Sequence, residues 1–275
     1  MPLIDPQGMS DLWASTVVMG RVIYAVVLRE SRTRYGNSDL GYFWALIEPL
    51  IELVVLLLVF TMMGRTSPVG VPLPVFLVTG LMPFKFFKEC VSRGATGATA
   101  NQALLTYPQV KVLDIVIGRV LLEAATICVV YVIFIFGLHY TTGEPLTTWR
   151  DNIPGMIGAI LSIFYFGLAF AIFSCALSRL TSVWMVVWGF MSRPLWFTSG
   201  IFFTLEHLPH NARAYAIYNP IAHMLEWWRS VSLSTFNSTV ASPSFVLATA
   251  TVVLFIGLGI DRLLNLTGHS DEPSG

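Results

Sequence analysis

The sequence predicts an all-α polytopic membrane protein, because it is rich in apolar residues, poor in charge and organised into long apolar stretches. Of its 275 residues, 55% are hydrophobic and 12% are charged, and the mean hydropathy is +0.70. A soluble domain carries about 25% charged residues. From Leu40 to Leu266, apolar stretches of roughly the 20 residues that a membrane helix needs follow one another closely.

Six apolar stretches are long enough to be transmembrane helices. They cover residues 41–63, 73–92, 110–138, 153–177, 183–203 and 244–264. The fifth contains Arg193 followed by Pro194, and proline removes a backbone donor and disturbs a helix. This stretch therefore either crosses the membrane or turns back inside it, and short outer or re-entrant helices are expected before the sixth.

Three regions are predicted: an N-terminal interface helix (residues 1–40), one transmembrane domain (41–266) and a short tail (267–275). With the N-terminus in the cytoplasm, nine basic residues lie on the cytoplasmic side and five outside, which favours cytoplasmic termini. The first apolar run lacks the features of a cleaved signal peptide and is expected to remain as an anchor. The two basic sets are Arg21, Arg29, Arg32, Arg34, Arg93, Lys111, Arg119, Arg179 and Arg262 inside, and Arg65, Arg150, Arg193, Arg213 and Arg229 outside.

No catalytic residue, metal site or bound cofactor is predicted. The three cysteines, Cys90, Cys128 and Cys175, stand apart and suit apolar packing. His207 and His210 are separated by Pro209, which suits an interfacial loop better than metal ligation. The chain contains neither a phosphate-binding loop nor a nucleophile elbow, and its formal net charge of zero gives no reason to expect a nucleic-acid partner.

Two cytoplasmic segments are candidates for contact with a motor protein. Residues 10–34 interleave apolar residues with Arg21, Arg29, Arg32 and Arg34, which is typical of a helix at the membrane interface. It is either a simple anchor or part of a docking surface. In the connection 93–111, Asn101 is expected to cap a short helix through Thr106 that ends before Pro108. This connection is either an ordinary loop or the place where a motor pushes.

Charges within the apolar stretches are the second group of candidates, because ionisable groups at membrane depth are expensive. Glu48 and Glu52 form a stripe with Trp44, and Lys85 and Lys88 lie at a similar depth in the next stretch. They are expected to pair, either only to neutralise each other or to line a translocation cavity.

Two further sets of residues are assessed in the same way. Arg119 and Glu123, four residues apart, are expected to neutralise each other along one helix face. Arg193 has no acidic residue within helical reach, so it either contacts an acidic polymer near the outer exit or binds carbonyl groups. The aromatic residues chosen for stacking on sugar rings are Tyr42, Phe43, Trp44 and Trp196.

Three sequence blocks resemble ABC-2 type export permeases, above all those of group 2 capsular polysaccharide exporters and the related O-antigen permeases. The first is residues 101–114 (NQALLTYPQVKVLD), followed by Arg119 and Glu123. The second runs from residue 193 (RPLWFTSGIFF) through Leu208-Pro209 and residues 218–223 to residues 226–229 (EWWR). The third is residues 32–49, at the start of the first stretch.

The resemblance implies a homodimer in the bacterial inner membrane, with two separate cytoplasmic ATPase subunits that bind ATP and Mg. It also implies a lipid-linked capsular polysaccharide as substrate, a periplasmic co-polymerase-like adaptor, an outer-membrane channel, and short outer helices near residues 205–231. The residues implied to contact the ATPase are Arg29, Arg32, Arg34, Asn101, Leu104, Leu105, Thr106, Tyr107 and Pro108.

Other functions stay open at this point. Within the same fold, the substrate could be O-antigen, teichoic acid or a small molecule. An ion-coupled secondary transporter would use carboxylates such as Glu48 and Glu52 and often has inverted repeats, which are not evident. A membrane-embedded transferase would need a denser acid/base cluster than Glu206, His207 and His210 provide.

Overall fold

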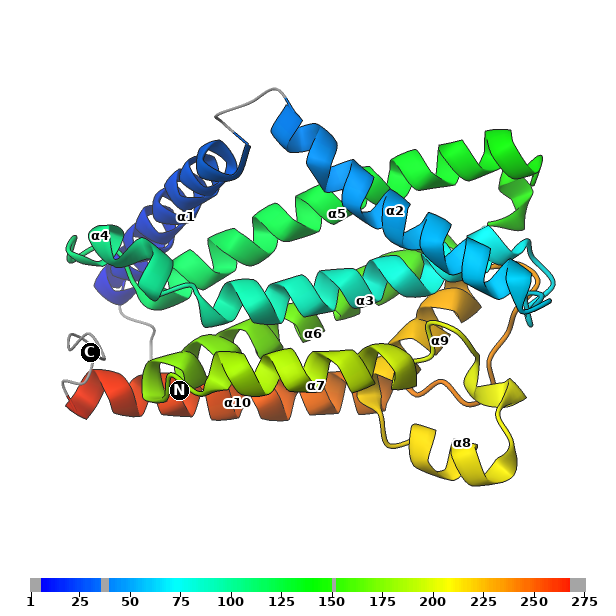
Figure 1. Cartoon of the computed structure of the whole chain (residues 1–275). Coiled ribbons are helices and arrows are strands. Elements are labelled where there is room, and N and C mark those ends of the chain that lie inside the picture. The colour runs from blue at the N-terminus through cyan, green and yellow to red at the C-terminus, as the bar shows by residue number, and fades with distance from the viewer. Residues whose placement is uncertain (1–5, 36–39, 150–151, 268–275) are drawn as a thin grey trace.

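The computed structural model describes residues 6–35, 40–149 and 152–267, and the regular elements of this part are all helical (Figure 1). Short 3-10 turns occupy Thr99–Asn101, Leu146–Thr148 and Leu205–His207. The α-helices are α1 (Pro6–Tyr35), α2 (Leu40–Met62), α3 (Leu73–Ala95), α4 (Gln102–Leu105), α5 (Val112–Thr142), α6 (Ile153–Leu180), α7 (Trp184–Thr198), α8 (His210–Ala216), α9 (Pro220–Ser232) and α10 (Pro243–Thr267).

Four helices of the described part are long and apolar enough to cross a membrane: α5, α6, α10 and the Phe43–Met62 part of α2. They correspond to the first, third, fourth and sixth predicted stretches, and the all-α membrane class is confirmed. The second stretch forms α3, which carries Lys85, Lys88, Glu89 and Arg93 in its second half. Six complete spans therefore stay a prediction.

The fifth predicted stretch is helical only in part. Helix α7 has 15 residues, which at 1.5 Å per residue extend about 22 Å, less than the roughly 30 Å of a hydrocarbon core. Pro194 lies inside α7, and the helix continues to Thr198. The chain then turns at Gly200, whose φ of 82° belongs to the left-handed region that glycine tolerates. The outer boundary predicted at residue 203 was therefore wrong.

Short helices do form in the range where the resemblance implied outer helices. The turn Leu205–His207, helix α8 and helix α9 follow one another there, and α9 is almost completely buried. Their position on the outer side of a membrane stays a prediction. What the structure adds is that α9 is part of the protein core.

Helix α3 lies at the centre of the bundle, where it packs against α5 and α6, while α10 lies along the other side of α6. Phe87 of α3 is 1% exposed, and its ring meets Phe166 and Phe170 of α6 and Trp188 of α7 at centroid distances of 5.3, 5.2 and 5.9 Å. This aromatic cluster explains why α3 tolerates charge in its second half: its other face is firmly buried.

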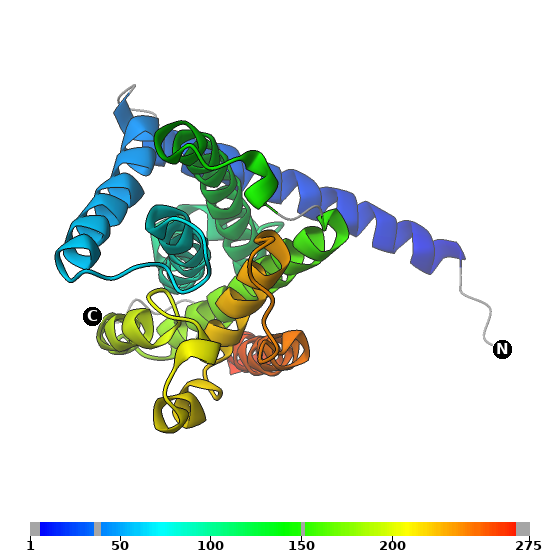
Figure 2. The ribbon, with the colours of Figure 1, turned by 90° about the vertical axis from the view of Figure 1, so that its right-hand side faces the viewer.

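Helices α2 and α7 lie on the same side of α3, as the view along the bundle in Figure 2 shows. Both helices contact α3. Much of their surface is apolar and exposed, as at Ile51 and Val55 of α2 and Phe190 of α7. Apolar exposure of this kind suits a surface covered by lipid or by another membrane helix. Helices α2 and α7 therefore carry apolar surface that the core of the bundle does not cover.

Close backbone contacts hold α3 and α10 against α6. A Cβ atom added at Gly94 of α3 would lie 2.3 Å from the carbonyl oxygen of Ala171, and one at Gly257 of α10 would lie 2.8 Å from Cα of Phe173. Small residues let membrane helices approach each other in this way. Glycine is therefore required at both positions by packing, not by backbone conformation.

The replacement Gly94→Ala is expected to destabilise the protein by about 1–3 kcal/mol, because the added methyl group would push α3 away from the α6 backbone. Thermal unfolding of the purified chain in one detergent measures this loss. The matched control is Gly137→Ala in α5, where a Cβ atom meets nothing within 4 Å and stability should stay equal or rise. Equal melting temperatures for the two variants would contradict the packing argument.

Candidate functional site

A cavity of about 260 Å³ lies between α2, α3 and α7. We call it the basic cavity, because three cationic side chains, Lys85 and Lys88 of α3 and Arg193 of α7, take part in its lining. Glu52 of α2 is the acidic residue that lines it. The remaining lining is Leu81, Phe84, Ser192, Trp196 and Phe197.

Lys85 forms the predicted contact between the first two apolar stretches. Its Nζ lies 2.7 Å from Oε1 of Glu48 and 3.9 Å from Oε2 of Glu52, while the Lys85 side chain is 12% exposed. The predicted ion pair between these stretches is confirmed for Lys85, whereas Lys88 forms no ion pair with a described residue. Two carboxylates share one lysine, so one negative charge remains, and Lys88 is close enough to act on both carboxylates electrostatically without a direct contact.

Lys88 and Arg193 make no ion pair and no hydrogen bond with the described residues, and both side chains are exposed. Arg193 does not bind carbonyl groups, which was one of its two predicted roles. It lines the same cavity as Lys85 and Lys88 of α3, and its location near the outer exit stays a prediction. The result is a pair of free cations in one cavity, which is a site that suits an anion.

Trp196 is the one predicted sugar-stacking residue that lines the cavity. Its ring meets Phe202 and Phe197 at centroid distances of 4.5 and 4.8 Å, and Phe202 in turn stacks on Phe60 of α2 at 5.4 Å. Phe43 and Trp44 are exposed on α2 but do not line the cavity, and the side chain of Tyr42 lies outside the described residues. The aromatic lining therefore comes from Trp196 and Phe197 of α7 and Phe84 of α3, and Phe202 of the loop packs behind Trp196.

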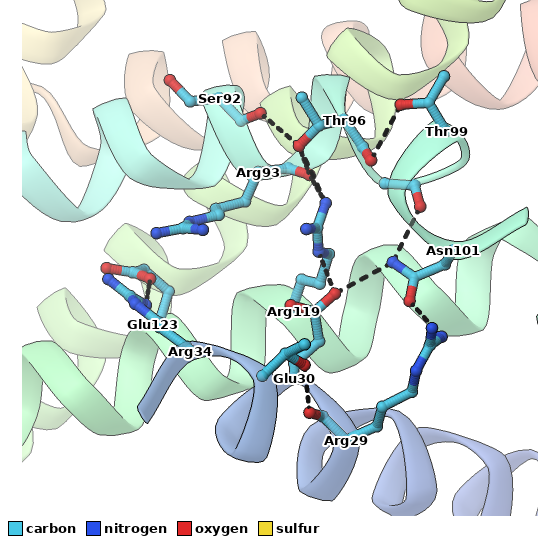
Figure 3. A network of polar contacts seen from close by, with 12 residues as sticks. Arg29, Glu30, Arg34, Ser92, Arg93, Thr96, Thr99, Asn101, Arg119 and Glu123 are labelled. Atoms are coloured by element: carbon cyan, nitrogen blue, oxygen red, sulfur yellow. Dashed lines mark hydrogen bonds and ion pairs between the residues drawn. The ribbon is translucent and has the colours of Figure 1, made fainter. Parts of the chain in front are cut away.

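The second candidate region is the α1–α5 network, which joins α1 to α5 and to the connection between α3 and α5 (Figure 3). Its members are Arg29, Glu30, Arg34, Arg93, Thr96, Asn101, Arg119 and Glu123. Arg29 of α1 donates from Nη1 to Oδ1 of Asn101 over 2.9 Å, and Nδ2 of Asn101 donates to Oε1 of Glu30 over 3.0 Å. Asn101 stands at the N-cap of α4 but makes no capping bond. The capping prediction was wrong because both ends of its amide bind α1 instead.

Arg119 and Glu123 do not neutralise each other as predicted. Nε of Arg119 donates to Oε1 of Glu30 over 2.7 Å, and Oε2 of Glu123 accepts from Nη1 of Arg34 over 2.5 Å. Both partners come from α1, because α1 crosses α5 closely at Gly118 and brings opposite charges within reach. Sequence reasoning missed Glu30, since nothing in the sequence distinguishes it from a solvated interface residue.

Arg119 also fixes the end of α3. Its Nη1 donates to the carbonyl of Arg93 over 2.8 Å and to Oγ1 of Thr96 over 3.0 Å, and in Figure 3 its side chain bridges Glu30 and this end of α3. The side chains beyond the network are free to meet a partner: Thr106, Tyr107, Pro108 and Arg32 are exposed, whereas Leu104 and Leu105 are half-buried. The residues predicted to contact the ATPase thus fall into two sets, one exposed and one that supports the exposed residues.

Arg229 is the largest fully buried side chain, although the sequence placed it among the exposed outer cations. It donates to the carbonyls of Gly200, Ile201 and Phe203 over 2.5, 3.0 and 3.2 Å and lies over the ring of Phe76 at 4.2 Å. It therefore has the carbonyl-binding role considered for Arg193.

The side chain of Arg229 fits against α3 because Gly80 has no Cβ atom. A Cβ atom at Gly80 would lie 2.3 Å from Nη2 of Arg229, and Thr79 accepts from its Nε over 3.2 Å. Burial lowers the pKa of Arg229 to about 10 despite the opposing effect of Glu226, so it stays charged at neutral pH. No group of three or more potential metal ligands is present among the described residues.

Replacing Glu30 by Gln is expected to cost about 2 kcal/mol of stability at neutral pH, because it removes the charge that Arg119 faces. Burial raises the pKa of Glu30, but Asn101 and Arg119 outweigh it and hold the pKa below the ordinary 4.5. A lowered pKa means that the stabilisation is complete above about pH 4.5 and is lost as the pH falls through the folded-state pKa.

Melting temperatures of wild type and Glu30→Gln between pH 7 and pH 4 measure this dependence. The difference should be constant above pH 5 and shrink below pH 4.5. The partly exposed Glu89, whose Oε2 lies 3.5 Å from Nε of Arg93, provides the control Glu89→Gln. A difference that persisted unchanged at the lowest pH would show that the Glu30 charge does not carry the effect.

Comparison with known proteins agrees with this architecture. The sequence model of the ABC-2 type transporter family matches residues 21–233. The chain is 32% identical to the polysialic acid transport protein KpsM of Escherichia coli over 243 residues, 87% of this chain and 92% of that protein.

Two further relatives cover the chain to a similar extent. The capsule polysaccharide export inner-membrane protein BexB of Haemophilus influenzae is 29% identical over 89% of this chain and 91% of its own length. The O-antigen export system permease protein RfbA of Klebsiella pneumoniae is 24% identical over 87% and 90%. This chain therefore belongs to the ABC-2 type transporter family, as a membrane subunit of an ABC transporter.

Proposed function

We propose that this chain is the permease subunit of an ATP-driven exporter that moves lipid-linked capsular polysaccharide across the bacterial inner membrane. The observation that carries the proposal is the match, over nearly nine tenths of the chain, to proteins named for polysialic acid transport and capsule polysaccharide export. The basic cavity supports it, because such a polymer needs a polar path between helices.

The proposed assembly is a homodimer with two cytoplasmic ABC ATPase subunits, which would bind ATP and Mg. A periplasmic co-polymerase-like adaptor and an outer-membrane channel would receive the polymer, and both termini of this chain would lie in the cytoplasm. The excess of basic residues on the inner side supports this orientation. The exposed apolar faces of α2 and α7 suit contact with the second copy.

The substrate path is proposed to run through the basic cavity. Lys88 and Arg193 would contact the acidic groups of the polymer in turn, while Trp196 offers an aromatic face to the C–H groups of the sugar rings. Lys85, Glu48 and Glu52 would act mainly as the contact that joins α2 to α3. Repeated weak contacts of this kind allow a polymer to slide, whereas one tight site would stop it.

The coupling surface is proposed to consist of the exposed residues Thr106, Tyr107 and Pro108, with Arg32 on α1. Leu104, Leu105 and Asn101 would support this surface from below, and Arg29 and Arg34 would hold α1 beside it. ATP-driven closure of the two ATPase subunits would push on this surface and open a groove between the first and fifth apolar stretches of the two copies.

O-antigen export is the second candidate function, because the chain also matches an O-antigen permease. The identity to that protein is 24%, against 32% and 29% for the two capsule-related proteins. The free cations of the cavity further favour a charged polymer over a neutral one. The capsule assignment is therefore preferred.

Co-purification with the ATPase tests the proposed assembly, and Tyr107→Ala tests the coupling surface. The wild-type chain, purified in mild detergent from its host, should bring down an ABC ATPase in equal amount. Tyr107→Ala should keep the membrane fold, because the side chain is 60% exposed, but lower export per ATP hydrolysed by roughly ten-fold, about 1.4 kcal/mol of coupling.

The control is Tyr215→Ala on α8, which removes an 82% exposed tyrosine at the opposite end of the bundle. It should leave both ATPase recovery and export unchanged. Recovery of the chain without any ATPase would refute the assembly, and normal export by the Tyr107 variant would refute the coupling surface.

Arg193→Ala and Lys88→Ala are each expected to slow export of an acidic polymer by about five-fold, which corresponds to ~1 kcal/mol for a partly solvated charge contact. A neutral polymer of similar length should be slowed by less than two-fold. Polymer taken up into the lumen of inverted vesicles, whose cytoplasmic face and ATPase subunits lie outside, measures both rates. Arg213→Ala on α8 is the control, and equal slowing of both polymers would rule out the charge contact.

A further inference from the structure

We propose that residues 22–34 of α1 and the cytoplasmic half of α5 form one rigid transmission body, in which α1 neither hinges away from α5 nor slides along it. This inference rests on the proposed function, because it describes how motion reaches the membrane helices. A helix that merely anchors the chain at the membrane surface would instead move independently of α5.

The charge order along the two helices permits a single register. On α1 an acid, Glu30, precedes a base, Arg34, by one turn; on α5 a base, Arg119, precedes an acid, Glu123, by one turn. The structure pairs Glu30 with Arg119 and Arg34 with Glu123. A slide of one turn, about 5.4 Å, would bring Glu30 to Glu123 or Arg34 to Arg119. Like charges would then meet.

Burial of the four charged side chains strengthens the preference for this one register. The side chains of Arg119 and Glu123 are 7% and 2% exposed, and those of Glu30 and Arg34 are 16% and 25% exposed. Charges that are sheltered from water interact more strongly than surface pairs, and a sheltered charge that loses its partner is expensive. Sliding would therefore cost twice, through repulsion and through the loss of both pairs.

Close packing where α1 crosses α5 adds a further contact to the two ion pairs. Val26 of α1 is 2% exposed and lies on Gly118, one residue before Arg119. A Cβ atom at Gly118 would be 2.9 Å from Cγ1 of Val26 and 3.4 Å from the carbonyl oxygen of Ile23. The two helices thus meet with side chain against backbone, and there is no space in which α1 could rock.

The connection that would receive the push is fixed to the same body at both ends. Asn101 binds Arg29 and Glu30, while Arg119 binds the end of α3 at Arg93 and Thr96. At the other end, the backbone N–H of Lys111 donates to Asp114 over 3.0 Å, so α5 starts directly after the connection. Displacement of the exposed residues 106–109 would therefore move α1 and α5 together.

A disulfide between α1 and α5 tests the rigid body. In a chain with Cys90, Cys128 and Cys175 replaced by alanine, Val26→Cys and Gly118→Cys place two thiols at the crossing, where an ideal Cβ at Gly118 lies 3.2 Å from Cβ of Val26. This approaches the ~3.5–4.5 Å of natural disulfides. In the complex with its ATPase, the oxidised protein should export within two-fold of the reduced protein.

Loss of export by more than ten-fold on oxidation, restored by a reductant, would overturn the proposal, because it would mean that α1 must move relative to α5. The Val26→Cys single variant, which keeps Gly118 and adds no atom against it, is treated with the same oxidant, controls for other effects of oxidation and should export equally before and after.

Amide hydrogen exchange of the purified chain tests the same body without relying on export. Residues 22–34 of α1 should exchange as slowly as residues 113–123 of α5. Exchange at least ten-fold faster in residues 22–34 would overturn the proposal even if export were normal. Slow exchange in a protein that recruits no ATPase and exports no polymer would leave the rigid body standing and would refute the proposed function.

Discussion

The structure depends on one constraint: a charge that leaves water must find a partner, because an unpaired charge in an apolar environment costs several kcal/mol. Arg179 of α6 pairs with Asp261 of α10, Lys85 of α3 pairs with α2, and the α1–α5 network joins α1 to α5. Two of these contacts involve long apolar helices, α6 with α10 and α2 with α3, whereas α1 carries further charges along its length. The charges therefore decide which helices meet and in which register, while apolar packing supplies most of the contact area.

The same need for a partner applies to buried backbone carbonyl groups, and Arg229 supplies it. The chain leaves helical geometry after Thr198, so several carbonyl groups lose their helical partners, and the buried guanidinium donates to three of them. Glu226 accepts from the backbone N–H of Leu205 over 3.2 Å and serves the same loop from the other side. Irregular backbone at this depth is tolerated when protein groups satisfy it. Two charged residues of α9 thus fix the segment that follows the C-terminal end of α7, which is one wall of the basic cavity.

Helix α3 connects the regions to which function is assigned. Its end is held by Arg119, its middle presents Lys85 and Lys88 to the cavity, and Thr79 near its start binds Arg229. Motion at the α1–α5 network would thus pass along α3 to the cavity, whose other walls, α2 and α7, lie outside the network. The paired charges are explained by structure, whereas Lys88 and Arg193 line the basic cavity without a direct ion pair to a described residue.

The sequence by itself determined the all-helical membrane class, most helix positions and the Glu48–Lys85 pair, because apolar length and periodicity are local properties and both groups lie at similar depth. Only the tertiary structure decided the partners of Arg119 and Glu123, the role of Asn101 and the burial of Arg229. In those cases the deciding group, such as Glu30 or the carbonyl of Ile201, lies far away in the chain. Contacts of that kind follow from how helices cross, and spacing along a single helix cannot reveal them.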